Sequence, residues 1–325
     1  MASPFRAENK CPNGLYMTEK FRKKISGAGF FITFLGAILF STKAIIIKKA
    51  FRATSVDPLT LLVLRMIFSL PFYMGVAILA SLKKDNVKMT QRQWVYVIIL
   101  GIAGYYLSSY FDFVGLQYVS AGLERLILFL YPTFAVLINS FAFKLKINRL
   151  QKIALALTYA GIGIAYFGEI KIDNGKPDLY WGSFLIFICA ITYSVYLVGS
   201  GRMIPKLGAT KFTAYAMLAA TGGVLLHFIL QKHNIDVLFN RSLFGYGMLL
   251  ALIATVIPSF MLSYGMKTIG PNNTAIMTSI GPVSTVLQAH FILGDKIFSE
   301  QIIGTILVIT GVLLIGWQNI DKREI

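Results

Sequence analysis

The chain has 325 residues, of which 56% are hydrophobic and 14% are charged, and its mean hydropathy is +0.68. A soluble protein of this length could not cover so much apolar surface, so the composition excludes that class and predicts a polytopic membrane protein. The formal net charge of +17 would suggest nucleic-acid binding in a soluble protein. Here the basic residues are spread over short connections, which indicates topology signals and contacts with anionic lipid headgroups and no nucleic-acid partner.

The first 27 residues carry Arg and Lys but no apolar run. We therefore expect residues 1–27 to form a cytoplasmic N-terminal arm without a cleavable signal peptide, and the first helix to direct insertion. The two cysteines, Cys11 and Cys189, set no disulfide framework, and neither has a metal-ligand partner nearby. The sequence predicts no metal site and no cofactor.

Ten apolar segments follow one another along the chain, each near the length of about 20 residues that crosses a bilayer core. They are residues 28–50, 58–82, 93–114, 120–143, 150–168, 180–201, 210–230, 243–266, 271–293 and 299–318. No Pro-rich or low-complexity linker divides them. The fold class predicted is therefore an all-α polytopic membrane protein with ten transmembrane helices in one bundle.

The second half of the chain repeats the first at an offset of 150 residues. Residues 265–317 align with residues 115–167 without a gap, and Pro282 then falls on Pro132. A duplicated membrane bundle is typical of a transporter, because two similar halves can rock about a shared central site.

The earlier parts of the two copies match more weakly, with Gly29 opposite Gly182. We place the first repeat at residues 28–168 (helices 1–5) and the second at residues 180–318 (helices 6–10). Because five is an odd number, the copies must cross the membrane in opposite directions, which predicts two inverted five-helix repeats.

The distribution of basic residues predicts the orientation. If both termini are cytoplasmic, the inner connections and the stretches directly beside the first and last helices, counted from Lys20 to Arg323, hold 18 Lys and Arg residues and the outer loops hold 8. The connection between helices 4 and 5 has four basic residues, whereas its counterpart between helices 9 and 10 has only Lys296. We therefore expect a multi-pass protein of the cell (inner) membrane with both termini in the cytoplasm.

Several motifs occur in an order known from one transporter family. They are Asp57-Pro58, Leu64-Arg65-Met66, the run from Gly115 to Gly122, Pro132, Pro282, Leu293-Gly294-Asp295-Lys296, Gln301, Gly304 and Gly311. With these residues the chain resembles the EamA-type members of the drug/metabolite transporter superfamily, from Gly29 to Trp317. The resemblance implies a secondary transporter that exports small metabolites, amino acids or toxic compounds by alternating access.

The chain departs from the family pattern at three places. The loops after helices 4 and 9 usually have Glu after their Gly, whereas this chain has Leu145 and Asp295. Helix 1 reads Phe40-Ser41-Thr42-Lys43, where many members have a Trp-Gly pair. Substrate contacts of relatives at helix 1 therefore do not transfer to this chain.

Five ionisable residues lie inside the predicted segments, all in the first repeat and in the outer half of the membrane: Lys43, Arg65, Asp112, Glu124 and Arg125. Ionisable groups in hydrocarbon are costly and usually serve function or pair with one another. We expect them to line the outer part of a substrate path or gate. Three cations and two carboxylates suit a zwitterionic or anionic metabolite and leave a carboxylate able to carry a proton. The alternatives are a structural ion-pair network between helices 2, 3 and 4, and, for Lys43, snorkelling towards the outer surface.

Tyrosines cluster in the same region, and Tyr105, Tyr106 and Tyr131 are predicted to line the path. A tyrosine offers an apolar face and a hydroxyl group, which suits a pocket for solutes of mixed polarity. The alternative is that these are ordinary core or interface aromatics.

Pro132 and Pro282 fall at equivalent depths of helices 4 and 9, and Ser279 lies close to the second. Each proline removes a backbone hydrogen bond and bends its helix. Since freed carbonyls are tolerated only within protein or beside a wet cavity, we expect paired bends at a central cavity. The alternative is a static kink that serves packing alone.

The sequence has no phosphate-binding loop and no recognisable catalytic motif, so it predicts no enzyme. The expected partners are a small-molecule solute, a proton and the lipid bilayer, in a monomer or homodimer. Three alternatives stay open: an uptake carrier or exchanger, a membrane-embedded enzyme or lipid-handling protein, and a non-transporting scaffold.

Overall fold

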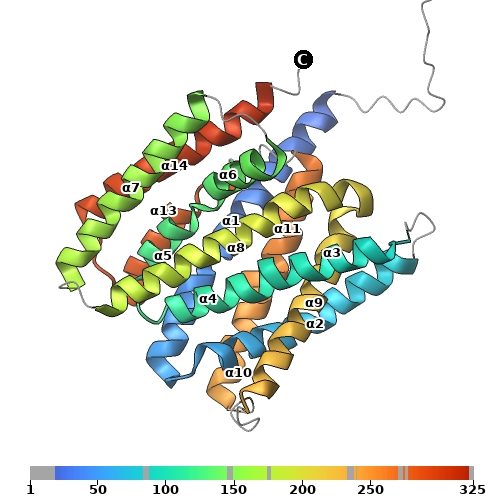
Figure 1. Cartoon of the computed structure of the whole chain (residues 1–325), viewed down its shortest axis with the longest axis horizontal. Coiled ribbons are helices and arrows are strands. Elements are labelled where there is room, and N and C mark those ends of the chain that lie inside the picture. The colour runs from blue at the N-terminus through green and yellow to red at the C-terminus, as the bar shows by residue number, and fades with distance from the viewer. Residues whose placement is uncertain are drawn as a thin grey trace, which may run out of the picture.

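The computed structural model describes residues 19–82, 88–144, 149–173, 177–232, 238, 240–269, 274 and 277–321. These residues form helices joined by short connections, and no strand occurs among them (Figure 1). The predicted all-α class is confirmed.

The first half of the bundle contains eight helical elements, named in chain order. They are α1 (Glu19–Thr54), α2 (Pro58–Leu82), α3 (Gln91–Gly101), η1 (Ile102–Leu107), α4 (Ser108–Gly115), α5 (Ala121–Leu128), α6 (Tyr131–Phe143) and α7 (Arg149–Asp173). The second half follows this order up to α11, which corresponds to α4. Its elements are α8 (Pro177–Leu207), α9 (Ala209–Leu230), α10 (Arg241–Ala251), η3 (Leu252–Val256), α11 (Ile257–Thr268), α13 (Gly281–Gln288), η4 (Ala289–Leu293) and α14 (Ser299–Asp321).

Eight helices are long and apolar enough to cross a membrane, and they correspond to the first eight predicted segments. The tenth segment contains a shorter apolar helix over Ser299–Leu314. The ninth segment, 271–293, lies partly outside the described residues and continues as α13 and η4. The first helix already begins at Glu19, so residues 19–27 of the predicted arm are helical, while residues 1–18 lie outside the described part.

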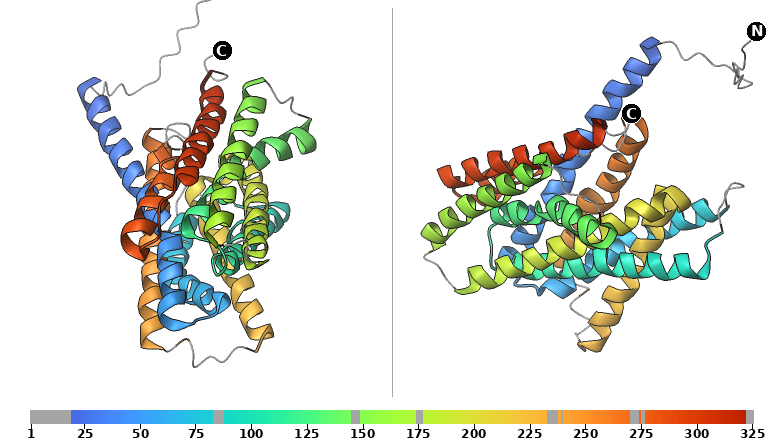
Figure 2. Two further views of the ribbon diagram at one scale, coloured as in Figure 1. Left: turned by 90° about the vertical axis from the view of Figure 1, so that its left-hand side faces the viewer. Right: turned by 45° about the horizontal axis from the view of Figure 1, so that its top comes forward.

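The helices form one bundle with α7 and α14 side by side on one flank and α2, α9 and α10 on the opposite flank (Figures 1 and 2). Both described ends of the chain, the start of α1 and the end of α14, lie at the same end of the bundle (Figure 1). We call this the terminal end and the other the far end. This placement is what an even number of crossings requires.

The helices are apolar on most of their surface, which explains how they pack. In α2, Leu61 and Met66 are fully buried in the largest apolar core, which α2 builds with α1, α9 and α10. On the same helix, Phe72 and Leu79 are exposed. A helix with apolar residues on both its inner and its outer face is stable where lipid covers the outer face.

Reciprocal contacts relate the two halves. A Cβ atom added at Gly29 in α1 would lie 2.6 Å from Thr268 Oγ1 of the second half. A Cβ atom added at Gly182 in α8 would lie 2.6 Å from Tyr118 Cβ of the first half. Gly182 is the predicted counterpart of Gly29, and Thr268 follows Tyr118 by the repeat offset. The halves therefore exchange equivalent contacts, as a two-fold relation between them requires.

Irregular turns recur at the same offset. The π-helical turn η1 begins at Ile102 in helix 3, and η3 begins at Leu252 in helix 8. Each occurs within one long apolar span, and π-turns of this kind are frequent at functional sites.

Candidate functional site

An ion pair is buried between helix 1 and helix 3. The Nζ atom of Lys43 in α1 lies 2.6 Å from Oδ2 of Asp112 in α4. The Asp112 side chain has no exposed surface, and Lys43 is 9% exposed. The Lys43 ammonium group therefore binds inside the bundle and does not snorkel to the surface. Taking two charges out of water is costly, so removing either partner would leave an uncompensated buried charge.

Glu124 adds a second carboxyl group to this pair. It lies in the first turn of α5, which begins after Ser120, whose hydroxyl accepts a hydrogen bond from the Leu123 N–H group. Glu124 is fully buried, and neither of its carboxyl oxygens has a hydrogen-bond partner. It interacts electrostatically with Asp112 and Lys43. Glu124, Asp112 and Lys43 therefore form one group of interacting charges inside the bundle.

Arg125 occupies the boundary between the two halves. Its guanidinium group lies 5.6 Å from the Phe40 ring centre and 5.4 Å from that of Phe129, both within the range of cation–π contact. Its Nη2 atom lies 3.4 Å from Ser41 Oγ, and its Nε atom is buried without a hydrogen-bond partner. A Cβ atom at Gly281, the first residue of α13, would lie 2.8 Å from Nη2. The missing side chain of Gly281 is what leaves room for the guanidinium group.

Arg65 completes the predicted set on the side of helix 2. Its guanidinium group is buried 5.5 Å from the centre of the Phe113 ring, and its Nε atom also lacks a hydrogen-bond partner. It interacts electrostatically with Asp112 and Tyr105. The structure therefore brings all five predicted ionisable residues into one buried group, which we call the ion cluster: Lys43, Arg65, Asp112, Glu124 and Arg125.

The structure separates the predicted tyrosines into two places. The hydroxyl groups of Tyr105 and Tyr196 lie 2.9 Å apart, and Tyr131 packs edge-on against Tyr193 at 5.3 Å between ring centres. Tyr105 and Tyr131 thus contact neighbouring residues of α8. Tyr106 instead faces α9, with its ring 5.8 Å from that of His227.

The two prolines lie at helix breaks. Helix 4 is interrupted at Phe129–Leu130, and Pro132 is the second residue of α6. Helix 9 is interrupted at Ser279–Ile280, and Pro282 is the second residue of α13. These positions correspond at the repeat offset. Both helices restart at the break, so the irregularity is larger than the predicted bend. A proline in a first helical turn loses no hydrogen bond and is well tolerated there.

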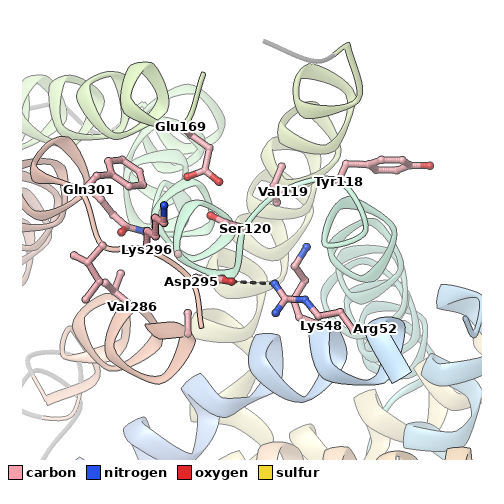
Figure 3. Close-up of a pocket in the computed structure, with 14 residues that line it drawn as sticks. Lys48, Arg52, Tyr118, Val119, Ser120, Glu169, Val286, Asp295, Lys296 and Gln301 are labelled. Atoms are coloured by element: carbon pink, nitrogen blue, oxygen red, sulfur yellow. Dashed lines mark hydrogen bonds and ion pairs between the residues drawn. The ribbon is translucent and has the colours of Figure 1, made fainter. Parts of the chain in front are cut away.

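A pocket of about 280 Å³ lies at the far end of the bundle (Figure 3). Its lining comes from both halves: Lys48, Arg52, Tyr118, Val119, Ser120, Gly122, Glu169, Val286, Ala289, Asp295, Lys296, Ile297, Phe298 and Gln301. No predicted site residue is among them. The pocket is therefore separate from the ion cluster, and the sequence did not predict it.

An ion pair crosses one wall of the pocket. Nη2 of Arg52, at the end of α1, lies 2.9 Å from Oδ1 of Asp295, and Nη1 donates to the Leu293 carbonyl at 2.7 Å (Figure 3). On the same helix, Lys48 Nζ donates to the Leu116 carbonyl at 2.9 Å. Three motifs noted in the sequence contribute to this pocket: the run from Gly115 to Gly122, the Leu-Gly-Asp-Lys motif, which departs from the family pattern at Asp295, and Gln301.

Comparison with known proteins identifies the family. The model of the EamA-like transporter family matches residues 27–167 and again residues 180–317. The chain belongs to the EamA-like transporter family. It is 25% identical over 304 residues to the uncharacterized transporter YcbK of Bacillus subtilis, which covers 90% of this chain and 95% of YcbK.

Two further comparisons agree with this assignment. The uncharacterized transporter YyaM of Bacillus subtilis is 26% identical over 245 residues, which covers 74% of this chain and 79% of YyaM. A crystal structure superposes with a TM-score of 0.61 at 21% identity, covering 89% of this chain and 96% of the other. The fold is thus shared with a solved structure. Together with the apolar helices, family membership makes this chain an integral multi-pass membrane transporter.

Proposed function

We propose that this family member is a secondary carrier that exports small zwitterionic or anionic metabolites, amino acids among them, by alternating access. The observation that carries the proposal is the ion cluster at the boundary of two similar halves. Similar halves can rock against each other around a site fixed between them. Arg125 supports this placement, because it reaches from helix 4 to Ser41 in helix 1 and to the start of α13.

The charge of the cluster supports the substrate class. Three basic side chains and two carboxyl groups, when all are charged, leave an excess of one positive charge in a region that is almost entirely buried. An arginine that lacks a partner for one donor can bind a substrate carboxylate in a fixed geometry. A solute with a carboxylate would balance the cluster, whereas a solute with positive charge alone would add to the excess.

Glu124 supports proton coupling in the same site. It is fully buried and interacts with the Asp112 carboxyl group, so a proton carried by this pair of carboxyl groups would change the charge of the whole cluster. Binding of a proton and binding of a charged substrate would then influence each other within one cluster. This coupling is the condition for exchanging a proton for a substrate.

We also propose that the protein lies in the cell (inner) membrane with both termini in the cytoplasm. The support is the excess of basic residues in the connections at the terminal end. In this orientation the ion cluster lies nearer the external surface, and the far-end pocket opens outside.

The test is solute efflux from proteoliposomes that contain the purified protein, with serine, glutamate and putrescine loaded together and a pH gradient applied or omitted. We expect loss of serine or glutamate that the gradient accelerates, and retention of putrescine. Glu124→Gln should keep the shape of the site and remove the response to pH. Retention of all three solutes by the wild-type protein contradicts the proposed substrate class. Solute movement only into the vesicles would reverse the direction and favour an uptake carrier.

A further inference from the structure

The far-end pocket carries the same charge balance as the ion cluster. Three of its lining side chains are cationic, Lys48, Arg52 and Lys296, and two are carboxylates, Glu169 and Asp295. The hydroxyl group of Ser120 and the amide of Gln301 add further polar groups. A volume of about 280 Å³ is near the lower limit of pockets that hold small molecules. Its charge and size therefore fit a small solute with a carboxylate.

The helices that line the pocket also carry the ion cluster. On α1, Lys48 lines the pocket and Lys43 belongs to the cluster, five residues or about 7.5 Å apart along the axis. On α5, Gly122 lines the pocket and Arg125 follows three residues or about 4.5 Å later. The pocket is thus one to two helical turns from the cluster along the same helices.

The two sites are separated by close packing in this structure. A Cβ atom at Gly122 would collide with the amide of Gln301, which is itself buried, and would touch Val286 at 3.5 Å. Gly122 comes from the first half, and Gln301 and Val286 come from the second. The floor of the pocket is therefore a contact between the two halves, and movement of one half against the other would open or close it.

We propose that this pocket is an outer binding site for small carboxylate-bearing solutes, in series with the ion cluster, and that the Arg52–Asp295 pair is the contact that closes it. The order of the two sites rests on the proposed transport function, whereas binding in the pocket does not. Lys48 and Lys296 approach the pocket from opposite walls, with Glu169 above them, so a carboxylate and an ammonium group of one solute can both find partners (Figure 3).

The exposure of the Arg52–Asp295 pair fits a contact that breaks in each cycle. The Arg52 side chain is 52% exposed. An exposed ion pair changes an equilibrium by at most about fivefold, so it biases closure without locking it. Lys171 and Glu300, 3.1 Å apart between α7 and α14, also join the two halves but do not line the pocket. That pair provides a matched control.

Binding can be tested in the purified full-length protein in detergent, without transport. The reporter is Ile297→Cys, in the pocket wall, in a chain whose native cysteines are replaced (Cys11→Ser and Cys189→Ala). The measurement is the rate of modification by a maleimide with serine, glutamate or putrescine present. Because occupancy slows modification in proportion to 1 + [L]/Kd, a probe at about four times its Kd slows it about fivefold.

We expect serine or glutamate to slow the modification and putrescine to leave it unchanged. Lys48→Gln with Lys296→Gln should raise the Kd of the protecting solute about tenfold, so that the same solute concentration slows modification only about 1.4-fold, while Lys171→Gln should not change the protection. The proposal is overturned if neither carboxylate solute protects, if putrescine protects equally, or if protection survives loss of both lysines. Protection without efflux in proteoliposomes would retain the pocket and reject the transport function. Efflux from proteoliposomes without protection in detergent would retain the transport function and reject the pocket as a binding site.

The closing contact has its own measurement in the same reporter chain. Asp295→Asn should accelerate maleimide modification in the absence of solute by about two- to fivefold, because the wall is held less firmly. Glu300→Gln, which breaks the control pair, should leave the rate unchanged. Equal rates in both variants and the parent would show that Arg52 and Asp295 do not close the pocket.

Discussion

The two halves of the bundle pack alike, but their buried polar residues differ. Gly115 meets Ile186 of the second half, and Gly265 meets Thr33 of the first, at the offsets that relate the copies. The ion cluster has no such symmetry. All five of its residues belong to the first half, and the position equivalent to Asp112 is Leu262.

This difference indicates how a duplicated bundle acquires one site. The helix packing shared by the two halves depends on small residues at helix contacts, which both copies retain. The chemistry of the site depends on a few ionisable residues that only the first copy carries. It also depends on residues of the second copy that make room for them. Gly281 is such an adjustment, because its counterpart is Tyr131, and a side chain there would displace the Arg125 guanidinium group.

The largest expected effect comes from unbalancing the buried ion pair. Asp112→Asn or Lys43→Gln alone should destabilise the protein by about 3–5 kcal/mol, because each leaves one buried charge without its partner. The measurement is the apparent melting temperature of the purified protein in detergent. The double variant should recover much of this loss, and a double variant as unstable as the sum of the singles would show that the two residues act separately.

The close helix packing found in both halves can be disrupted at the contact between helices 5 and 10. A Cβ atom at Gly161 would lie 2.6 Å from the Gly304 carbonyl oxygen, and backbone atoms there cannot move aside easily. Gly161→Ala should therefore destabilise the protein by about 1–3 kcal/mol.

Gly163 is the matched control on the same helix, since a Cβ atom there has nothing within 4 Å. Gly163→Ala should be neutral or stabilising by up to about 1 kcal/mol, the difference in helix propensity. Equal melting temperatures of the two variants would mean that this glycine contact does not hold the halves together.

The asymmetry at the helix breaks is tested by Gly281→Ala. The new methyl group would push against the end of the Arg125 side chain, which can move, so stability should fall by only about 1 kcal/mol. Solute efflux should fall several-fold, because Arg125 would no longer lie against α13. Gly222→Ala in α9, where there is open space, is the control and should leave both quantities unchanged.

The smallest expected effect distinguishes two adjacent tyrosines. Tyr105→Phe removes the hydroxyl that meets Tyr196 across the halves and should lower stability by about 1 kcal/mol. Tyr106→Phe keeps the ring that packs against His227 and should have a smaller effect. The two melting temperatures are compared directly, and a reversed order would place Tyr106 in the polar contact between the halves.

The sequence predicted most of the fold because lipid imposes simple rules. Length and apolar composition located the spans, and the repeat offset related the halves. The same offset placed the helix breaks at Pro132 and Pro282, although the breaks are larger than bends. The sequence identified the five ionisable residues because such groups are rare in apolar segments, but it did not predict the pair of Asp112 with Lys43: the expected ion-pair network involved helices 2, 3 and 4, and Lys43 lies in helix 1.

The pocket could not be predicted in the same way. Lys48, Glu169 and Lys296 lie near helix ends, where charged residues are ordinary, and only the folded chain brings them to one pocket. Tyr106 was predicted to line the path as one of a cluster of tyrosines, which sequence alone does not separate by direction. Neighbouring residues of a helix point in different directions, so one faces α8 and the other α9.

The π-helical turns of helices 3 and 8 also record the history of the chain. Before the turns, the helix-capping residues Thr90 and Asn240 are 150 residues apart, and after them Gly115 and Gly265 keep the same spacing. A residue inserted into only one copy would have shifted this spacing on one side of the turn. The equal spacing is what duplication of a segment that already contained the widened turn would produce.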